Sequence, residues 1–289
     1  MAYNRAMRCT VSSLLLVAAL VVGLSRVSAA GLDDAAAVPH LDAHGLDAYR
    51  QFLAAPPPRA FAIAPGGGWG WSADAESQEL AEKEALANCQ ANTVQTCMTY
   101  ALDNRVVFNT AAWVRAWRPH SSAGQADRAK VGMLRGQRFP NLLFRDPDGK
   151  PIKLADLRGQ VVVLHFWGSW CPPCQREMPD LARLTASMRK DKSVRFVFLQ
   201  VREDFSTAKQ WANRVAKGLP LYDSGMRKSA DSSFALADGG RLADRVVAMA
   251  FPTTYVLDGH GVVLFSHVGP IEHWQQYAPL LRDAAAAFK

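Results

Sequence analysis

Two cysteines separated by two prolines lie in the stretch HFWGSWCPPCQREMP (165–179). One close pair disfavours structural zinc, which takes four ligands and typically two such pairs. Haem attachment is disfavoured because Gln175, not histidine, follows Cys174. A purely structural Cys171–Cys174 disulfide would close a tiny loop and constrain little of the unfolded chain. The spacing therefore favours reversible thiol–disulfide exchange, with copper binding by the two thiolates as the alternative.

The two prolines bear on the direction of electron flow. Cys171 follows an apolar strand, QVVVLHFW, and precedes a helical pattern, so we expect it at a helix N-terminus. Free N–H groups and the helix dipole stabilise a thiolate there. Pro172 and Pro173 have no N–H, and no basic residue stands between the cysteines. Fewer contacts to the thiolate favour a reductant over an oxidant.

Three neighbours of the pair have competing interpretations. Trp170 is expected to be a lid over the sulfurs rather than a core filler. His165 lies mid-strand, where a lone histidine is usually a satisfied core residue; the alternative is a proton relay to Cys174. Pro179 predicts a kink that shapes the helix without doing chemistry.

The segments around the motif predict an α/β domain over 133–289. QVVVLHFW and VRFVFLQV read as buried strands, and PTTYVLDGHGVVLFSHVG reads as two strands around a turn. Helices are expected over CQREMPDLARLTASMRK, STAKQWANRVAKG and EHWQQYAPLLRDAAAAF. Alternating strands and helices with a terminal hairpin argue for a central sheet flanked by helices.

These stretches resemble the thioredoxin superfamily, specifically the exported thiol–disulfide oxidoreductases of the TlpA/ResA type. The resemblance is carried by WCPPCQREMP after VVVLHFW, by FPNLLFRDPDGKPIKLADLRGQ and by FPTTYVLDGHGVVLFSHVG, and it covers roughly 133–289. It implies a thioredoxin-like fold with a central mixed sheet and an N-terminal hairpin. It also implies that Cys171 is the exposed attacking thiol and Cys174 the resolving thiol.

The same resemblance implies a substrate-binding surface beside the disulfide. Pro252 would be a cis proline facing the sulfurs, with Phe251 presenting its backbone to a bound strand and Thr253 and Trp170 beside it. The chain departs from the family at His165, where relatives carry an acid or Asn. The segment 223–245 is longer than a minimal member needs, and we expect it to add a helix that shapes partner choice.

The N-terminus predicts export. Residues 1–30 combine arginines, a short apolar run and small residues before a cleavage point near Ala29 or Ala30, as in a signal peptide. The predicted location is the periplasm, with an uncleaved membrane anchor as the alternative. Removing three arginines and no acid lowers the formal charge of +7, and the modest excess that remains is spread along the chain. We expect no nucleic-acid partner.

A second, smaller unit is expected over 31–117. Its sequence predicts a small α+β module in which a disulfide between Cys89 and Cys97 ties a helix to a hairpin. A second redox pair is the alternative, disfavoured by the wide spacing. The polar stretch over 118–132 is the predicted linker to the α/β domain.

The expected function is an exported enzyme that reduces protein disulfides through Cys171 and Cys174, without metal or other cofactor. A membrane reductant partner would supply electrons because the compartment is oxidising. Candidate substrates, as in relatives, are apocytochrome c and copper-site proteins. The alternatives are a disulfide oxidant or isomerase with the same residues, and a copper-binding redox chaperone or adaptor that uses the 31–117 module as its interaction surface.

Overall fold

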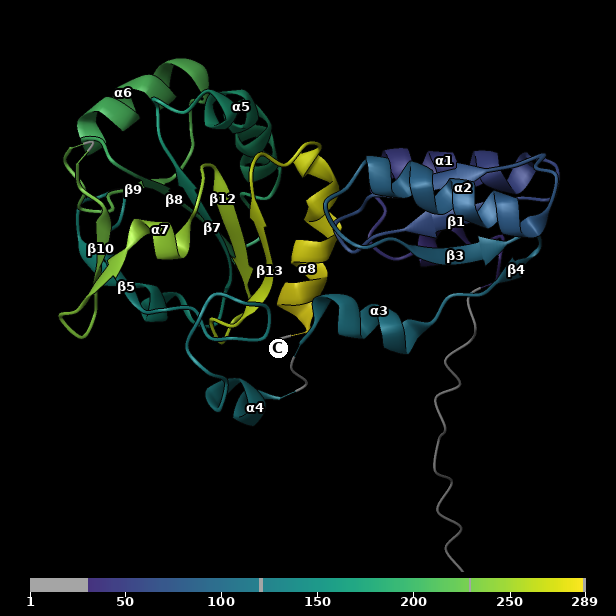
Figure 1. The fold of residues 1–289 in the computed structure, drawn as a ribbon, viewed down its shortest axis with the longest axis horizontal. Helices are drawn as coiled ribbons and strands as arrows, with labels where there is room; N and C mark the ends of the chain where they lie inside the picture. Colours follow the sequence, from purple (N-terminus) through teal and green to yellow (C-terminus); the bar gives the residue numbers. More distant parts are fainter. Residues whose placement is uncertain (1–30, 120–121, 229, 288–289) are drawn as a thin grey trace, which may run out of the picture. The chain divides into compact units, whose positions relative to one another are not determined.

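The computed structural model describes residues 31–119, 122–228 and 230–287 (Figure 1). The predicted signal peptide over 1–30 lies outside the described residues. Within the described part of the chain, no helix combines the length and apolar character needed to cross a membrane.

The N-terminal part contains a four-stranded sheet in the order β2-β1-β3-β4. Its elements are η1 (Ala35–Ala37), α1 (Ala43–Ala54), β1 (Ala60–Ile63), β2 (Trp69–Ser72), α2 (Gln78–Ala91), β3 (Met98–Leu102) and β4 (Arg105–Val106). Alanines of α2 pack against alanines of β1 in a small buried cluster that also contains Cys89. Strand β2 also packs closely against α2, because Gly70 has no side chain: a Cβ atom there would lie 2.2 Å from the backbone nitrogen of Cys89.

Two helices lie between the N-terminal sheet and the α/β region: α3 (Thr110–Trp117) and α4 (Ala123–Asp127). The segment expected to be a linker therefore contains one short helix, which Ser122 caps by accepting a hydrogen bond from Gln125 N. The main cluster of buried side chains includes residues from 31–117 as well as from 133–289. The position of the domain boundary stays a prediction.

The α/β region is built on a five-stranded mixed sheet in the order β13-β12-β7-β8-β9. Strands β7 (Val161–Trp167), β8 (Val194–Gln200) and β9 (Leu221–Tyr222) run parallel, whereas β12 (Thr253–Leu257) and β13 (Val263–Val268) are antiparallel to their neighbours. The helices are α5 (Pro172–Ser187), α6 (Phe205–Val215), η3 (Trp274–Tyr277) and α8 (Ala278–Ala286). This is the expected thioredoxin-like arrangement (Figure 1).

The alternation of side chains along β7 divides the core into two faces. Val161, Val163 and Trp167 share a cluster with buried residues of α5 and α8. Val162 and Phe166 belong to a second cluster, which packs against the strands on the other face. His165 has the same parity as Val163, so its side chain points toward the α5 face.

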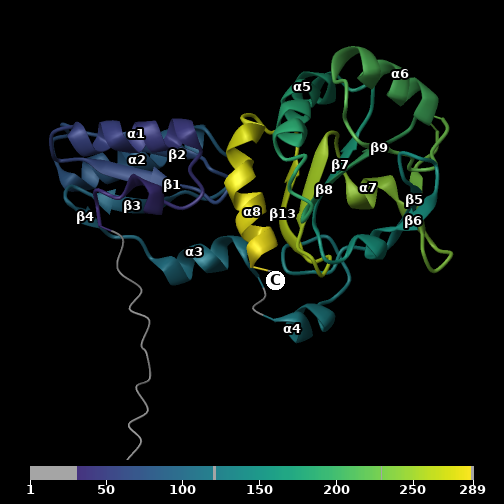
Figure 2. The same cartoon turned by 180° about the vertical axis from the view of Figure 1, so that it is seen from behind.

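A second sheet, β11-β10-β5-β6, covers the other face (Figure 2). It comprises β5 (Leu142–Arg145), β6 (Pro151–Lys153), β10 (Ser233–Leu236) and β11 (Arg241–Ala243), with η2 (Leu154–Leu157) and α7 (Asp244–Val247) beside it. The segment 223–245 contains the hairpin β10–β11, which the sequence did not predict, and the expected helix is limited to the four-residue α7, which begins at its end. Strand β10 pairs with β5, whose free backbone N–H and C=O groups extend the sheet to the hairpin.

Candidate active site

Cys171 and Cys174 form a disulfide at the N-terminus of α5, directly after the loop that follows β7. Cys171 is the N-cap residue, and its sulfur accepts a hydrogen bond from the Cys174 N–H at 3.3 Å. Pro172 and Pro173 occupy the first two helical positions. The N-cap side chain usually accepts from the second or third N–H group of the helix. Because Pro173 at the second position has no N–H, the Cys174 N–H is the remaining donor to the Cys171 sulfur.

Cys171 is less accessible than the resemblance implied. Cys171 is 3% exposed and Cys174 is fully buried. The thiol that the resemblance implies to be the attacking one is therefore nearly buried in the disulfide form.

The loop that precedes Cys171 is fixed through Ser169. Both carboxylate oxygens of buried Glu203 accept hydrogen bonds from Ser169, one from its N–H at 2.6 Å and one from its hydroxyl. The Gln175 side chain donates to the Ser169 carbonyl at 2.5 Å. Burial raises the pKa of Glu203 above its usual value. Glu203 is 34 residues from Ser169 in the sequence, and nothing in the local pattern pointed to it.

Trp170 is not a core residue, since it is 46% exposed. Its indole N–H donates to the Val201 carbonyl at 2.9 Å, and its ring meets the Phe251 ring edge-on, with centroids 5.9 Å apart. A Cβ atom on Gly168 would lie 2.4 Å from the indole nitrogen, so this position of the Trp170 ring requires glycine at residue 168. Trp170 thus forms part of the surface around the disulfide.

The turn before β12 faces the disulfide. The Phe251–Pro252 peptide bond is cis, as expected, and the Phe251 carbonyl oxygen lies 3.4 Å from the sulfur of Cys171. Thr253 is fully buried, and its hydroxyl donates to the Ala250 carbonyl at 2.7 Å. Its side chain therefore holds the turn and does not point to the surface. The backbone of Phe251 remains the part of this turn that faces the sulfur.

A cation also contacts the ring of Phe251. The Arg202 guanidinium lies 5.4 Å from the centroid of the Phe251 ring and pairs at 2.5 Å with Asp244, whose side chain is fully buried. Asp244 begins α7, in the segment that is longer than a minimal member needs. That segment therefore contributes to the surface around the disulfide.

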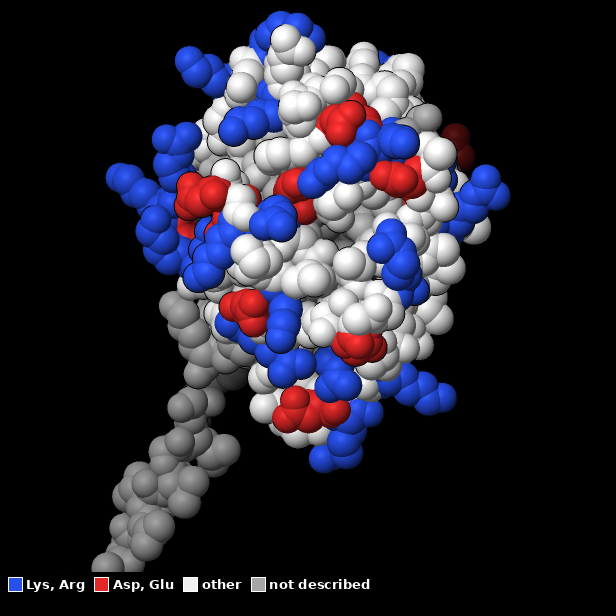
Figure 3. All heavy atoms as spheres, turned by 90° about the vertical axis from the view of Figure 1, so that its left-hand side faces the viewer, with Lys and Arg blue, Asp and Glu red and all other residues white. Residues whose placement is uncertain are grey.

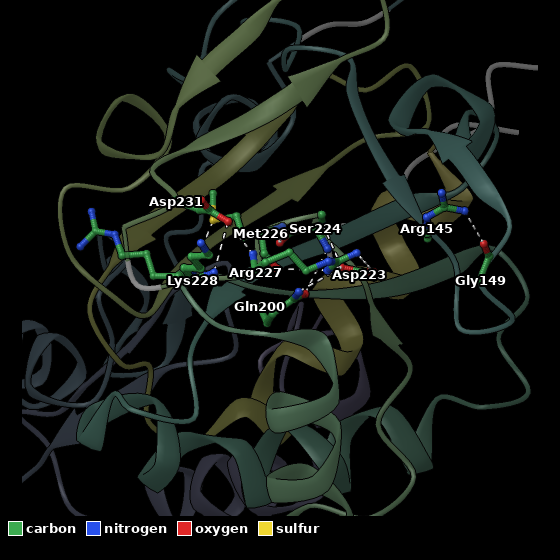
Figure 4. Close-up of polar contacts among 11 residues, drawn as sticks. Arg145, Gly149, Gln200, Asp223, Ser224, Met226, Arg227, Lys228 and Asp231 are labelled. Atoms are coloured by element: carbon green, nitrogen blue, oxygen red, sulfur yellow. Dashed lines mark hydrogen bonds and ion pairs between the residues drawn. The ribbon is translucent and has the colours of Figure 1, made fainter.

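A polar network fixes the chain after β9, and Figure 4 shows how its side chains converge. Asp223 accepts hydrogen bonds from Gln200 at 3.1 Å and from both terminal nitrogens of Arg227 at 2.9 and 3.0 Å. These bonds lower the pKa of Asp223 in spite of its burial. The network positions Met226, whose sulfur accepts a hydrogen bond from Arg202 N at 3.3 Å.

Glu177 is a buried acid on the helix that carries the disulfide, and the sequence interpretation did not single it out. It lies three residues after Cys174 on α5, so the two side chains share a helix face. It is 4% exposed, and its Oε1 atom accepts hydrogen bonds from Trp274 Nε1 at 2.6 Å and from Ile271 N at 3.0 Å. Burial is the main cause that raises the pKa of Glu177 to about 7. The signal available in the sequence was an acid on the apolar face of the predicted helix.

His165 lies directly opposite Thr254 in the β7–β12 pairing. It is fully buried, and its Nδ1 atom is 2.8 Å from the Thr254 hydroxyl oxygen. Its Nε2 atom lies 3.8 Å from Glu177 Oε2. Burial lowers the pKa of His165 far below the usual value, so the imidazole is neutral at physiological pH. His165 is therefore a core histidine, but one that faces the buried carboxylate.

Outside this site, the structure joins Cys89 to Cys97 in a disulfide between the end of α2 and the start of β3. In the parts of the chain that the structure describes, no three His, Cys, Asp or Glu side chains are grouped so that they could hold a metal ion.

A disulfide at the N-terminus of a helix, next to a central strand of a mixed sheet and faced by a cis X–Pro turn, defines a thioredoxin-like redox protein. Residues 134–280 match the family described as Redoxin. The chain belongs to this family, and it is a thiol–disulfide oxidoreductase of the TlpA/ResA-like type.

Two curated relatives agree with this assignment. The thioredoxin-like protein YneN of Bacillus subtilis (strain 168) is 30% identical over 142 residues, which cover 49% of this chain and 76% of the relative. The thiol-disulfide oxidoreductase ResA of Bacillus thuringiensis (strain Al Hakam) is 30% identical over 144 residues, which cover 50% and 74%. A solved thioredoxin family thiol:disulfide interchange protein from Chlorobium tepidum TLS superposes with a TM-score of 0.38 at 23% identity, covering 52% of this chain and 97% of that one.

Proposed function

We propose that this oxidoreductase is a periplasmic reductant of protein disulfides. The observation that carries the proposal is the single backbone N–H, that of Cys174, within hydrogen-bond distance of the Cys171 sulfur in the described structure. The Phe251 carbonyl faces the same sulfur and would favour a thiol, which can donate to it, over a thiolate. A poorly stabilised thiolate makes the reduced form a better electron donor.

In the proposed reaction the Cys171 thiolate attacks one sulfur of a substrate disulfide. The substrate bond breaks, its other sulfur leaves as a thiolate that takes a proton from water, and a mixed disulfide forms on Cys171. Cys174 then gives up its proton and attacks the Cys171 sulfur, which releases the second substrate thiolate. Two electrons pass to the substrate, and the Cys171–Cys174 disulfide is left.

Glu177 is the proposed acceptor of the Cys174 proton. Its place on the face of α5 that carries Cys174 supports this role, as does a pKa raised to about 7 by burial. A base whose pKa lies near the operating pH is well matched to taking up and giving back a proton.

The proposed partners follow from the compartment. A dithiol of a membrane reductant would return two electrons to the Cys171–Cys174 disulfide, and no bound cofactor or metal takes part. Apocytochrome c and copper-site proteins are the proposed substrates. We expect no nucleic-acid partner; on the face shown in Figure 3, Lys and Arg are interspersed with Asp and Glu rather than gathered in one stripe.

Export is tested by sequencing the N-terminus of the protein recovered from the periplasm. We expect a mature chain that begins near Gly31, and a variant with charged residues in the apolar run of the leader should stay inside the cell. A chain recovered with Met1 from the membrane would point to an uncleaved anchor instead.

The direction of electron flow is tested by the reduction potential of the Cys171–Cys174 pair in thiol redox buffers. We expect a value near that of thioredoxin, about −270 mV, and far from the value of about −120 mV typical of strong periplasmic oxidants. A potential near −120 mV would contradict the reductant and favour the oxidant or isomerase.

A further inference from the structure

Two buried polar atoms, one on β7 and one on α5, face each other without a hydrogen bond. His165 Nε2 and Glu177 Oε2 are 3.8 Å apart, both side chains are excluded from solvent, and neither atom has a hydrogen-bond partner in the described structure. Buried polar atoms normally have partners, because an unpaired one costs roughly 1–3 kcal/mol. An approach of roughly 1 Å would bring this pair to an ordinary N–H···O length.

The second polar atom of each side chain, Glu177 Oε1 and His165 Nδ1, already has hydrogen-bond partners. The two sets of partners differ in whether they can both donate and accept. Glu177 Oε1 accepts from two N–H groups, which cannot reverse. His165 Nδ1 meets the hydroxyl of Thr254 at 2.8 Å, and a hydroxyl can either donate or accept. The hydrogen bonds to Glu177 Oε1 therefore have a fixed direction, whereas the hydrogen bond between His165 Nδ1 and the Thr254 hydroxyl can run in either direction.

We propose that Thr254, His165 and Glu177 form a hydrogen-bond chain whose direction reverses when Glu177 gains or loses a proton. With Glu177 ionised, Thr254 donates to Nδ1, and Nε2–H donates to the carboxylate. With Glu177 protonated, its O–H donates to Nε2, and Nδ1–H donates to the Thr254 oxygen. The imidazole holds one proton in both states, so the only net change is the proton on Glu177.

The surroundings favour a neutral imidazole over an imidazolium. Burial opposes the charged form of His165, which packs against Phe198 on β8 at a centroid distance of 5.6 Å. The titratable groups beside Glu177 are Cys174 and Asp180 on its own helix, Tyr277 of η3 and His165. Asp180 is an acid, so it adds to the cost of ionising Glu177, and a hydrogen bond from His165 would add to the compensation that Trp274 and Ile271 already provide.

This inference rests on the proposed function in one respect only: the proton that Glu177 takes up is the one Cys174 releases. His165 is then a positioning residue. It gives Glu177 a donor when the carboxylate is ionised and an acceptor when it is protonated, so neither state leaves Glu177 Oε2 unpaired. Proton uptake and release by Glu177 are thereby made easier in a dry site.

Nitrogen-15 NMR of the histidine rings in the mature protein tests the proposal directly. As the pH falls through the titration of Glu177, the ring proton of His165 should move from Nε2 to Nδ1. A single His165 tautomer at all pH values, or an imidazolium, would overturn the proposal.

Substitution provides a second, independent test. His165→Phe removes the donor to ionised Glu177, so the titration of the Glu177 carboxyl, followed by carbon-13 NMR, should move up by about one pH unit. His165→Gln, which can still donate and accept, should move it less. An unchanged midpoint in a folded His165→Phe protein would contradict the proposal. These readouts do not depend on disulfide exchange, so a failed reductase assay would leave them standing.

Discussion

The carbonyl oxygen of Phe251 lies 3.4 Å from the sulfur of Cys171, although the two residues are 80 positions apart in the sequence. In the disulfide the sulfur has no hydrogen, so this is a contact and not a hydrogen bond. After reduction a Cys171 thiol can donate to the carbonyl, whereas a thiolate would face the negative end of its dipole. The turn before β12 therefore opposes the stabilisation that the helix N-terminus provides.

The prolines of the motif give a prediction about the thiol. Pro173 occupies the second helical position, from which an N–H would reach the cap side chain. Pro173→Ala restores that donor and should lower the pKa of Cys171 by about one unit, because a hydrogen bond to a charged group contributes about 1.5 kcal/mol. The pH dependence of Cys171 alkylation measures it.

The matched control is Pro172→Ala. The first helical N–H does not reach the cap side chain, so this substitution should leave the pKa of Cys171 nearly unchanged. Pro173→Ala should also raise the reduction potential by up to about 30 mV. Equal effects of the two substitutions would show that the prolines do not act by removing a particular donor.

Glu177 gives a prediction about stability and pH. A folded-state pKa of about 7, against 4.5 as the ordinary value, means that the folded protein holds this proton longer than the unfolded chain. Relative to Glu177→Gln, the wild-type oxidised protein should lose roughly 3 kcal/mol of unfolding free energy as the pH rises from about 4.5 to about 7. Urea unfolding at several pH values measures the difference.

The test compares the unfolding free energies of the wild-type and Glu177→Gln proteins at each pH, rather than the pH dependence of the wild-type protein alone. Neutral buried His165 contributes the opposite slope, because its lowered pKa costs stability as the pH falls below the usual histidine value. Both proteins contain His165, so its contribution cancels. Glu272→Gln, at an exposed position, should show no comparable dependence. A pH-independent difference for Glu177→Gln would mean that the carboxyl is ionised normally.

The pair of Arg202 and Asp244 gives a prediction about packing beneath the substrate surface. Arg202→Met leaves the fully buried Asp244 side chain without its cation and should lower the unfolding free energy by about 3 kcal/mol. Arg227→Met should cost less, since Asp223 keeps its bond from Gln200. Denaturant unfolding of both variants measures the contrast, and equal losses would contradict this account.

The second disulfide gives a prediction about the N-terminal part. Cys89 and Cys97 are eight residues apart, and a loop of that size should contribute about 2.5 kcal/mol by constraining the unfolded chain. The double variant Cys89→Ser, Cys97→Ser should lose about that stability in thermal unfolding while the reduction potential of Cys171–Cys174 is unchanged. A shifted potential would indicate that the two disulfides communicate.

Much of the α/β region was predictable because its signals are local. The apolar run before the motif is β7, the periodic segment after it is α5, and the chain after Pro252 forms two paired strands. The hairpin within 223–245 was not predicted because its pairing depends on the free edge of another strand. Strand β5, about ninety residues earlier, supplies that edge.

The supporting residues of the site were harder to predict. Glu203 reads as an ordinary surface acid, since a carboxylate is usually exposed unless it is paired. Glu177 lies on the apolar face of the predicted helix, but no nearby residue in the sequence explains its burial. Their burial depends on donors far away in the sequence: Trp274 for Glu177, and Ser169 for Glu203. His165 was noticed as unusual for its strand, but its partners Thr254 and Glu177 come from two other elements.

The central claim is that Cys171 attacks and Cys174 resolves. The most direct test incubates reduced mature Cys174→Ser and Cys171→Ser proteins with insulin and analyses both by mass spectrometry. The account predicts a stable mixed disulfide on Cys171 in the first variant, released by added dithiol, and little adduct in the second, whose remaining thiol is fully buried. Adducts on Cys174 in the second variant, with none on Cys171 in the first, would contradict it.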